Sequence, residues 1–166
     1  MKALRTLRGP LAAVVIAAAL SVSGCGTADT AAVVNGQVIS ETEAQRAARE
    51  INEAFSPQTP LDTPGAVSSL IAAPIINEVA SKVGKAESDS SARAAMPNIS
   101  DPSQASLDLV KANFALQKLT DQEKQQVLEQ LKKAEIKINP RYGSFDRDTA
   151  SFEAPARNWL KLPKQG

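Results

Sequence analysis

The segment from residue 103 to residue 139 contains neither glycine nor proline. These are the residues that most readily end a helix, so nothing in the segment forces a helix to stop. Leu107, Val110 and Phe114 follow one another in it at helical spacing, and a second apolar line runs beside them. An apolar stripe of this width predicts a long helix that packs on more than one side.

Thr120 lies in the middle of this segment and gives a conflicting indication. Thr120 and Glu123 fit a capping box, the pattern that begins a new helix. The helix therefore either breaks at Thr120 or continues to Ala134. Because no glycine or proline intervenes, we expect one continuous helix.

The part of the chain before this segment predicts a hairpin and two further helices. Asn35-Gly36 between short apolar runs is a strong hairpin pattern, because both residues accept a positive φ. Ser40 fits the cap of a helix that extends to Phe55. A second helix is expected from Thr63 to Gly84, with a kink at Pro74.

The part after residue 134 predicts one strand and a tail. Residues 135–139 alternate polar and apolar side chains, which is typical of a strand. Residues 141–146 resemble a structured turn, and residues 147–166 resemble a C-terminal tail. Taken together, the elements predict a mainly α-helical domain over residues 31–146 with a small sheet of two or three strands.

The first 24 residues have the pattern of an export signal. Basic residues occupy the beginning, an apolar run extends from Leu11 to Leu20, and small residues follow. The run is too short to cross a membrane as a helix, which takes about 20 apolar residues. We expect residues 1–24 to be a signal peptide.

The residues at the end of this signal are Val22, Ser23, Gly24 and Cys25, and they resemble a bacterial lipobox. That resemblance implies that the Cys25 thiol is acylated and that the chain is cut before it. Residues 25–30 would then be a lipidated tether, and the protein would lie on the extracytoplasmic face of the cell membrane. The alternative is an ordinary secretory signal with an incidental cysteine.

Composition excludes several kinds of function. The chain has one cysteine and no histidine, which excludes a disulfide within the chain, imidazole metal sites and Ser-His-Asp catalysis. Removal of the signal would take Lys2, Arg5 and Arg8 and leave all 18 acidic residues. The remaining chain would have no excess of basic residues, so its charge does not indicate nucleic acid as a partner. We expect no metal, no cofactor and no enzymatic activity.

Two sets of apolar residues are candidates for a binding surface. The first lies around the predicted kink and comprises Leu70, Ile71, Pro74 and Ile75. The second consists of Phe55 and Phe114. Helices that hold nonpolar peptide show an apolar face beyond what their own core needs. The alternative for both sets is ordinary core packing.

Two segments lie at the ends of the expected domain: Ala32–Gly36 followed by Ile39–Glu41, and Ile136–Gly143 followed by Phe145-Asp146. They resemble the start and the end of the N-terminal domain of SurA/PrsA-type chaperones, as found in short bacterial lipoproteins of the actinobacterial type. The resemblance implies a helical fold related to the trigger-factor peptide-binding domain, with the first strand paired to the last. Family members that are prolyl isomerases carry a separate parvulin domain with histidines, which this chain lacks.

Two functions are compatible with these features. The first is a lipid-anchored, chaperone-like module that binds extended or unfolded exported polypeptide, without isomerase activity. The second is a structural lipoprotein that docks to one dedicated partner in the cell envelope. An exposed apolar groove favours the first, and a flat patch favours the second.

Overall fold

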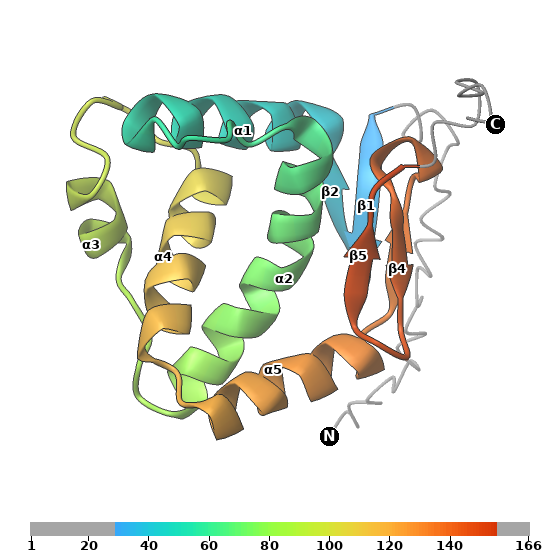
Figure 1. Cartoon of the computed structure of the whole chain (residues 1–166). Helices are drawn as coiled ribbons and strands as arrows, with labels where there is room; N and C mark the ends of the chain where they lie inside the picture. The colour runs from blue at the N-terminus through green and yellow to red at the C-terminus, as the bar shows by residue number, and fades with distance from the viewer. Residues whose placement is uncertain (1–28, 156–166) are drawn as a thin grey trace, which may run out of the picture.

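The computed structural model describes residues 29–155. The expected signal peptide, the lipobox residues Val22, Ser23 and Gly24, and Cys25 lie outside the described residues. Within residues 29–155 the fold is mainly α-helical with a small antiparallel sheet (Figure 1). This confirms the fold class expected from the sequence.

The helices surround a central member, α2. The helices are α1 (Glu41–Phe55), α2 (Thr63–Lys82), α3 (Asp89–Ala94), α4 (Gln104–Lys118), α5 (Asp121–Lys133) and a 3₁₀ turn η1 (Pro140–Tyr142). In Figure 1, α1 crosses one end of α2 and α5 crosses the other, while α4 lies on one side and the strands lie on the opposite side. α2 therefore buries apolar side chains in several directions.

The first strand is the centre of a three-stranded sheet. The strands are β1 (Thr30–Val34), β2 (Gln37–Ser40), β3 (Ile136–Ile138), β4 (Ser144–Asp146) and β5 (Ser151–Glu153). β1 pairs antiparallel with both β2 and β3, so the predicted hairpin and the pairing of β1 with a strand near the C-terminus are both present. Asn35 and Gly36 have φ values of 49° and 83°, as the tight turn requires. Asn35 also accepts from the Glu135 N–H at 2.9 Å, which ties this turn to β3.

The last two residues of the expected tether belong to the fold. Thr30 begins β1. The Asp29 carbonyl accepts from the Glu41 N–H at 2.7 Å, and its carboxylate accepts from the Thr42 backbone N–H and hydroxyl, each at 3.2 Å. Asp29 and Thr30 are therefore part of the described fold, and Asp29 is four residues after Cys25.

α2 is unbroken through Pro74, although that residue lies inside it. Figure 1 shows the helix changing direction along its length, as a proline inside a helix is expected to cause. The helix begins one residue earlier than a Thr63 cap would place it. Its N-cap is Asp62, whose carboxylate accepts from the Gly65 N–H at 2.8 Å.

The prediction of one continuous helix through Thr120 is wrong. α4 ends at Lys118, Leu119 is extended with ψ 135°, and Thr120 caps α5. The full capping box is present, with the Glu123 carboxylate accepting from the Thr120 N–H at 2.7 Å. The break lets α5 turn across the end of α2 and bury Val127 and Leu131. Burial of that apolar face explains why the cap outweighs the absence of a helix breaker.

The expected tail after Asp146 begins inside a hairpin. β4 and β5 pair across that boundary, and the Phe145 and Phe152 rings lie 5.0 Å apart between centroids. Burial of part of this aromatic pair against the main core stabilises two strands of only three residues each. Residues 151–153 are thus part of the domain.

Candidate functional site

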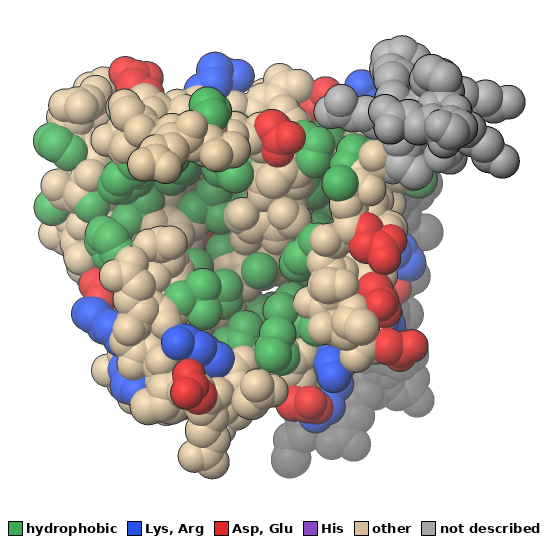
Figure 2. Space-filling model, viewed as in Figure 1, with side chains coloured by type: hydrophobic (Ala, Val, Ile, Leu, Met, Phe, Trp, Pro, Cys, Tyr) green, Lys and Arg blue, Asp and Glu red, His purple; other side chains and the backbone are tan. Residues whose placement is uncertain are grey.

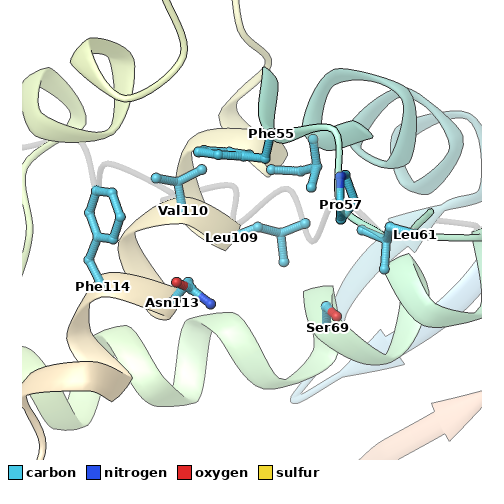
Figure 3. Close-up of a pocket in the computed structure, with 9 residues that line it drawn as sticks. Phe55, Pro57, Leu61, Ser69, Leu109, Val110, Asn113 and Phe114 are labelled. Atoms are coloured by element: carbon cyan, nitrogen blue, oxygen red, sulfur yellow. The ribbon is translucent and has the colours of Figure 1, made fainter. Parts of the chain in front are cut away.

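An apolar hollow of about 310 Å³ opens between α1, α2 and α4. Its lining residues are Ile51, Phe55, Pro57, Leu61, Ser69, Leu109, Val110, Asn113 and Phe114 (Figure 3). All of them except Ser69 and Asn113 are apolar. We call this hollow the α1–α4 groove. Figure 2 shows hydrophobic side chains gathered on the surface over this region.

The end of α1 forms one wall of the groove. Ser56 ends the helix in a left-handed conformation, φ 42°, and its N–H donates to the Asn52 carbonyl at 2.9 Å. The Asn52 side chain also forms two hydrogen bonds with the loop that follows α1. It donates to the Leu61 carbonyl at 2.9 Å and accepts from the Leu61 N–H at 2.7 Å. These two hydrogen bonds hold the loop with Pro57 and Leu61 against α1 as a fixed wall.

Two phenylalanines from distant parts of the sequence, Phe55 and Phe114, both line the groove. The Phe55 ring is 44% exposed, and Phe114 is half-buried. Figure 3 shows Val110 between the two rings and Leu109 below Phe55, and both of those aliphatic side chains are buried. An exposed aromatic ring beside an apolar hollow is typical of a binding site rather than of completed core packing.

The two polar lining residues lie on the side of the groove away from Phe55 (Figure 3). The Asn113 carbonyl oxygen accepts from Gln117 Nε2 at 2.8 Å. Asn113 is exposed and Ser69 is partly exposed, and within residues 29–155 neither Asn113 Nδ2 nor the Ser69 hydroxyl is hydrogen-bonded to another protein group. The groove therefore presents one amide donor and one hydroxyl along an otherwise apolar lining.

The structure separates the two sets of predicted binding residues. Leu70, Ile71 and Ile75 are 7%, 0% and 4% exposed, so they are part of the buried core, although Leu70 also lines a small hollow. They are buried because α2 is packed by elements on several sides. Pro74 is exposed and lines a different, smaller hollow of about 90 Å³ beside β2.

Sequence reasoning missed the polar part of the groove. Ile51, Val110 and Phe114 are visible in the sequence as members of apolar helical lines. Asn113 is a single polar residue between such lines, and no local pattern distinguishes it from a solvated position. Ser69 is equally inconspicuous.

The one buried carboxylate among residues 29–155 has a structural role. Glu50 on α1 is 9% exposed and lies at the start of α4. Its Oε2 accepts from the Ser103 N–H, the Ser103 hydroxyl and the Ser106 hydroxyl at 2.8, 2.7 and 2.6 Å. Its Oε1 accepts from Arg46 Nε at 2.6 Å. Every partner is part of the fold, so this carboxylate ties α1 to the N-terminus of α4.

Other charged residues of the described chain also have structural partners. The Arg141 guanidinium lies 5.7 Å from the centroid of the Tyr142 ring and 3.7 Å from the Glu41 carboxylate. Among residues 29–155, no group of three or more acidic side chains is placed to hold a metal ion. In the same part of the chain, no helix combines the length and apolar character needed to span a membrane.

Comparison with protein-family models, with curated proteins and with solved structures finds no significant match. The resemblance to SurA/PrsA-type domains therefore stays a prediction.

Proposed function

We propose that this chain is an exported lipoprotein, anchored by lipid on Cys25, that binds an extended apolar stretch of another exported polypeptide in the α1–α4 groove. The observation that carries the proposal is the exposed Phe55 ring beside a hollow lined by apolar side chains. Binding would be weak, would use no ATP and would involve no isomerase step. The occupant gains affinity by covering Phe55 and Phe114.

The polar residues of the groove favour polypeptide over a lipid chain. An acyl chain has no group to satisfy Asn113 Nδ2 or the Ser69 hydroxyl, and covering those groups without partners would cost free energy. An extended peptide carries a backbone carbonyl and an N–H at every residue. One carbonyl and one N–H of the peptide would hydrogen-bond to the polar residues of the groove, Asn113 and Ser69. The apolar side chains of the peptide would contact the apolar part of the lining.

The position of the groove also suits an anchored protein. The described domain begins at Asp29, which is bonded to the start of α1. The groove lies at the opposite end of α1, around Phe55. In Figure 1 the strands and the helical side that carries the groove lie on different sides of the molecule. A tether attached beside β1 therefore leaves the groove accessible.

The test is binding of a labelled, extended apolar peptide to residues 26–166, measured by fluorescence anisotropy. Phe55→Asp should weaken binding about ten-fold or more, because burial of a phenylalanine side chain contributes about 1.5–3 kcal/mol. The matched control is Val38→Asp, which alters another exposed apolar side chain, 57% exposed, in β2. Equal effects of the two substitutions would refute the assignment of the groove.

A second measurement tests the chaperone-like role itself. The same protein should slow aggregation of an unfolded exported client, and Phe55→Asp should abolish that effect. No suppression at several-fold molar excess would refute a general chaperone role. Stoichiometric capture of one envelope protein would instead favour a dedicated docking function.

A further inference from the structure

We propose that residues 86–100 form a flap that opens away from α4 and widens the α1–α4 groove for its client. This segment contains α3 and covers an apolar part of α4 that continues the groove. The inference rests on the groove of the proposed function and adds the class of client that the groove accepts.

The surface beneath the flap is apolar and continuous with the groove. It is a small cluster formed by Ala92 and Met96 of the flap and Leu107 and Val110 of α4, with Ile51 and Phe114 packed against it. Ile51, Val110 and Phe114 also line the groove. The groove and the covered surface therefore share three side chains, and only the flap separates the rest of the cluster from the groove.

Helical spacing places the α4 side chains in order around the helix. Leu109 and Asn113, four residues apart, line the groove. Val110 and Phe114 form the next line around α4, and Leu107 lies beyond that line. Leu107 is 0% exposed and does not line the groove while the flap is closed. Opening of the flap therefore makes the apolar face of α4 wider.

Between its ends, the flap is attached to the domain by side chains alone. Within the described chain, every backbone hydrogen bond of residues 86–100 closes inside the segment. Lys111 Nζ lies 2.7 Å from the Asp89 carboxylate, and Lys118 pairs with Glu87. Asp89 and Lys118 are about half exposed, so these ion pairs contribute little to holding the flap. Figure 1 shows α3 on the outer side of α4, away from α2. Such a segment opens at a lower cost in free energy than the whole domain.

The two ends of the flap are fixed, which defines where it would bend. Before it, the Lys85 N–H donates to the Ala80 carbonyl at 2.8 Å, and Lys85 Nζ lies 2.5 Å from the Glu123 carboxylate. After it, Arg46 Nη2 donates to the Asp101 carbonyl at 3.0 Å. Residues 86–100 therefore move between two anchored points, while α2 and α4 keep their packing.

The wider face selects a particular class of client. Side chains of an extended peptide point alternately to opposite sides of its backbone. With the flap closed, one row of apolar side chains enters the groove. With the flap open, the alternate row contacts the surface around Leu107. The open flap therefore favours a stretch that is apolar at every position over one that alternates apolar and polar residues.

Opening can be measured without any peptide. Residues 26–166 contain no cysteine, so one introduced thiol reports on its own exposure. Ala92→Cys places a thiol beneath the flap, and the control Ala115→Cys places one in the main core of α4; both alanines are 0% exposed. The Ala92→Cys thiol should react with a thiol reagent about ten-fold faster or more. Equal rates, after correction for the stability of each variant in urea, would overturn the flap.

A second measurement needs no introduced thiol. Glu87→Gln weakens the attachment of the flap by removing its pair with Lys118. It should raise the affinity for a labelled peptide that is apolar at every position several-fold, and leave the affinity for an alternating peptide of the same length unchanged. The matched control is Glu78→Gln, which removes an exposed ion pair with Lys82 on α2 and should change neither affinity. An equal change for both peptides, or no change, would overturn the widening of the groove.

The two measurements separate this inference from the proposed function. If the peptides bind while the two thiols react equally fast, the flap is overturned and peptide binding by the groove stands. If the Ala92→Cys thiol reacts faster but neither peptide binds, the proposed function fails and the opening of the flap stands.

Discussion

The buried carboxylate of Glu50 allows the most specific prediction about the stability of this fold. Burial by itself would raise the pKa of Glu50, but hydrogen bonds from Ser103, Ser106 and Arg46 outweigh it and lower the pKa to about 2. The ordinary value is 4.5. The ionised form is therefore much more stable in the folded chain than in the unfolded one.

The size of the effect follows from the two pKa values. A difference of about 2.5 pH units at about 1.36 kcal/mol each gives about 3 kcal/mol at neutral pH. The side chain is 11% exposed and its partner Arg46 is 48% exposed, so some of this is screened by solvent, and about 2–3 kcal/mol is expected. Because the folded pKa is the lower one, the contribution is complete above about pH 4.5 and is lost as the pH falls towards 2.

Glu50→Gln keeps the size of the side chain and removes its charge. We expect it to lower the free energy of unfolding by about 2–3 kcal/mol at pH 7, since the N-terminus of α4 and Arg46 lose a charged acceptor. Urea denaturation followed by circular dichroism at pH 7 and at pH 2.5 measures the difference. The control is Glu53→Gln, one turn later on α1 at an exposed position.

The outcome at low pH is decisive for the reasoning. The loss should be much smaller at pH 2.5 than at pH 7, because Glu50 is then largely neutral in the unfolded wild-type chain and partly neutral in the folded one. A loss below about 0.5 kcal/mol at pH 7 would refute the argument. An equal loss at both pH values would show that packing, and not charge, is responsible.

Three further predictions concern the helix break, the hairpin and the anchor. Thr120→Ala should lower the free energy of unfolding by about 1 kcal/mol in urea denaturation, because it removes the cap of α5; an unchanged midpoint would contradict this role. Gly143→Ala should lower the free energy of unfolding by about 1–3 kcal/mol, since the new Cβ would clash with the Glu153 carbonyl. Hydrogen exchange of the backbone amides should become faster first in β4 and β5. Cys25→Ala in the full chain should release the protein from the membrane fraction or leave the precursor uncleaved, and unchanged processing and retention would argue against acylation.

The sequence predicted well the features that depend on local chemistry. Asn35-Gly36 formed the expected turn, and Ser40 capped α1. The Thr120 capping box was also visible in the sequence. The expectation of a continuous helix was nevertheless wrong. Local propensity does not show which apolar side chains α5 can bury against α2 once the chain has changed direction. That gain comes from tertiary packing.

The candidate site was predicted only in part, for a related reason. A helix buried on several sides and a helix that exposes an apolar face have similar sequences, so Leu70 and Ile71 resembled Phe55 as candidates. Only the surroundings in the fold separate them, leaving Leu70 at 7% exposure and Phe55 at 44%. The β4–β5 hairpin was missed because strands of three residues carry too short an alternation to detect.

The pairing of β1 with β3 has a consequence for when this domain can fold. Val34 is paired with Ile136, so the sheet closes only after nearly the whole domain is available. Closing so long a loop costs entropy that local contacts do not repay, which makes the step late and slow. The edge of β1 that faces β3 therefore stays unpaired until residues 136–138 are available, while the β1–β2 hairpin and the helices can form from local contacts.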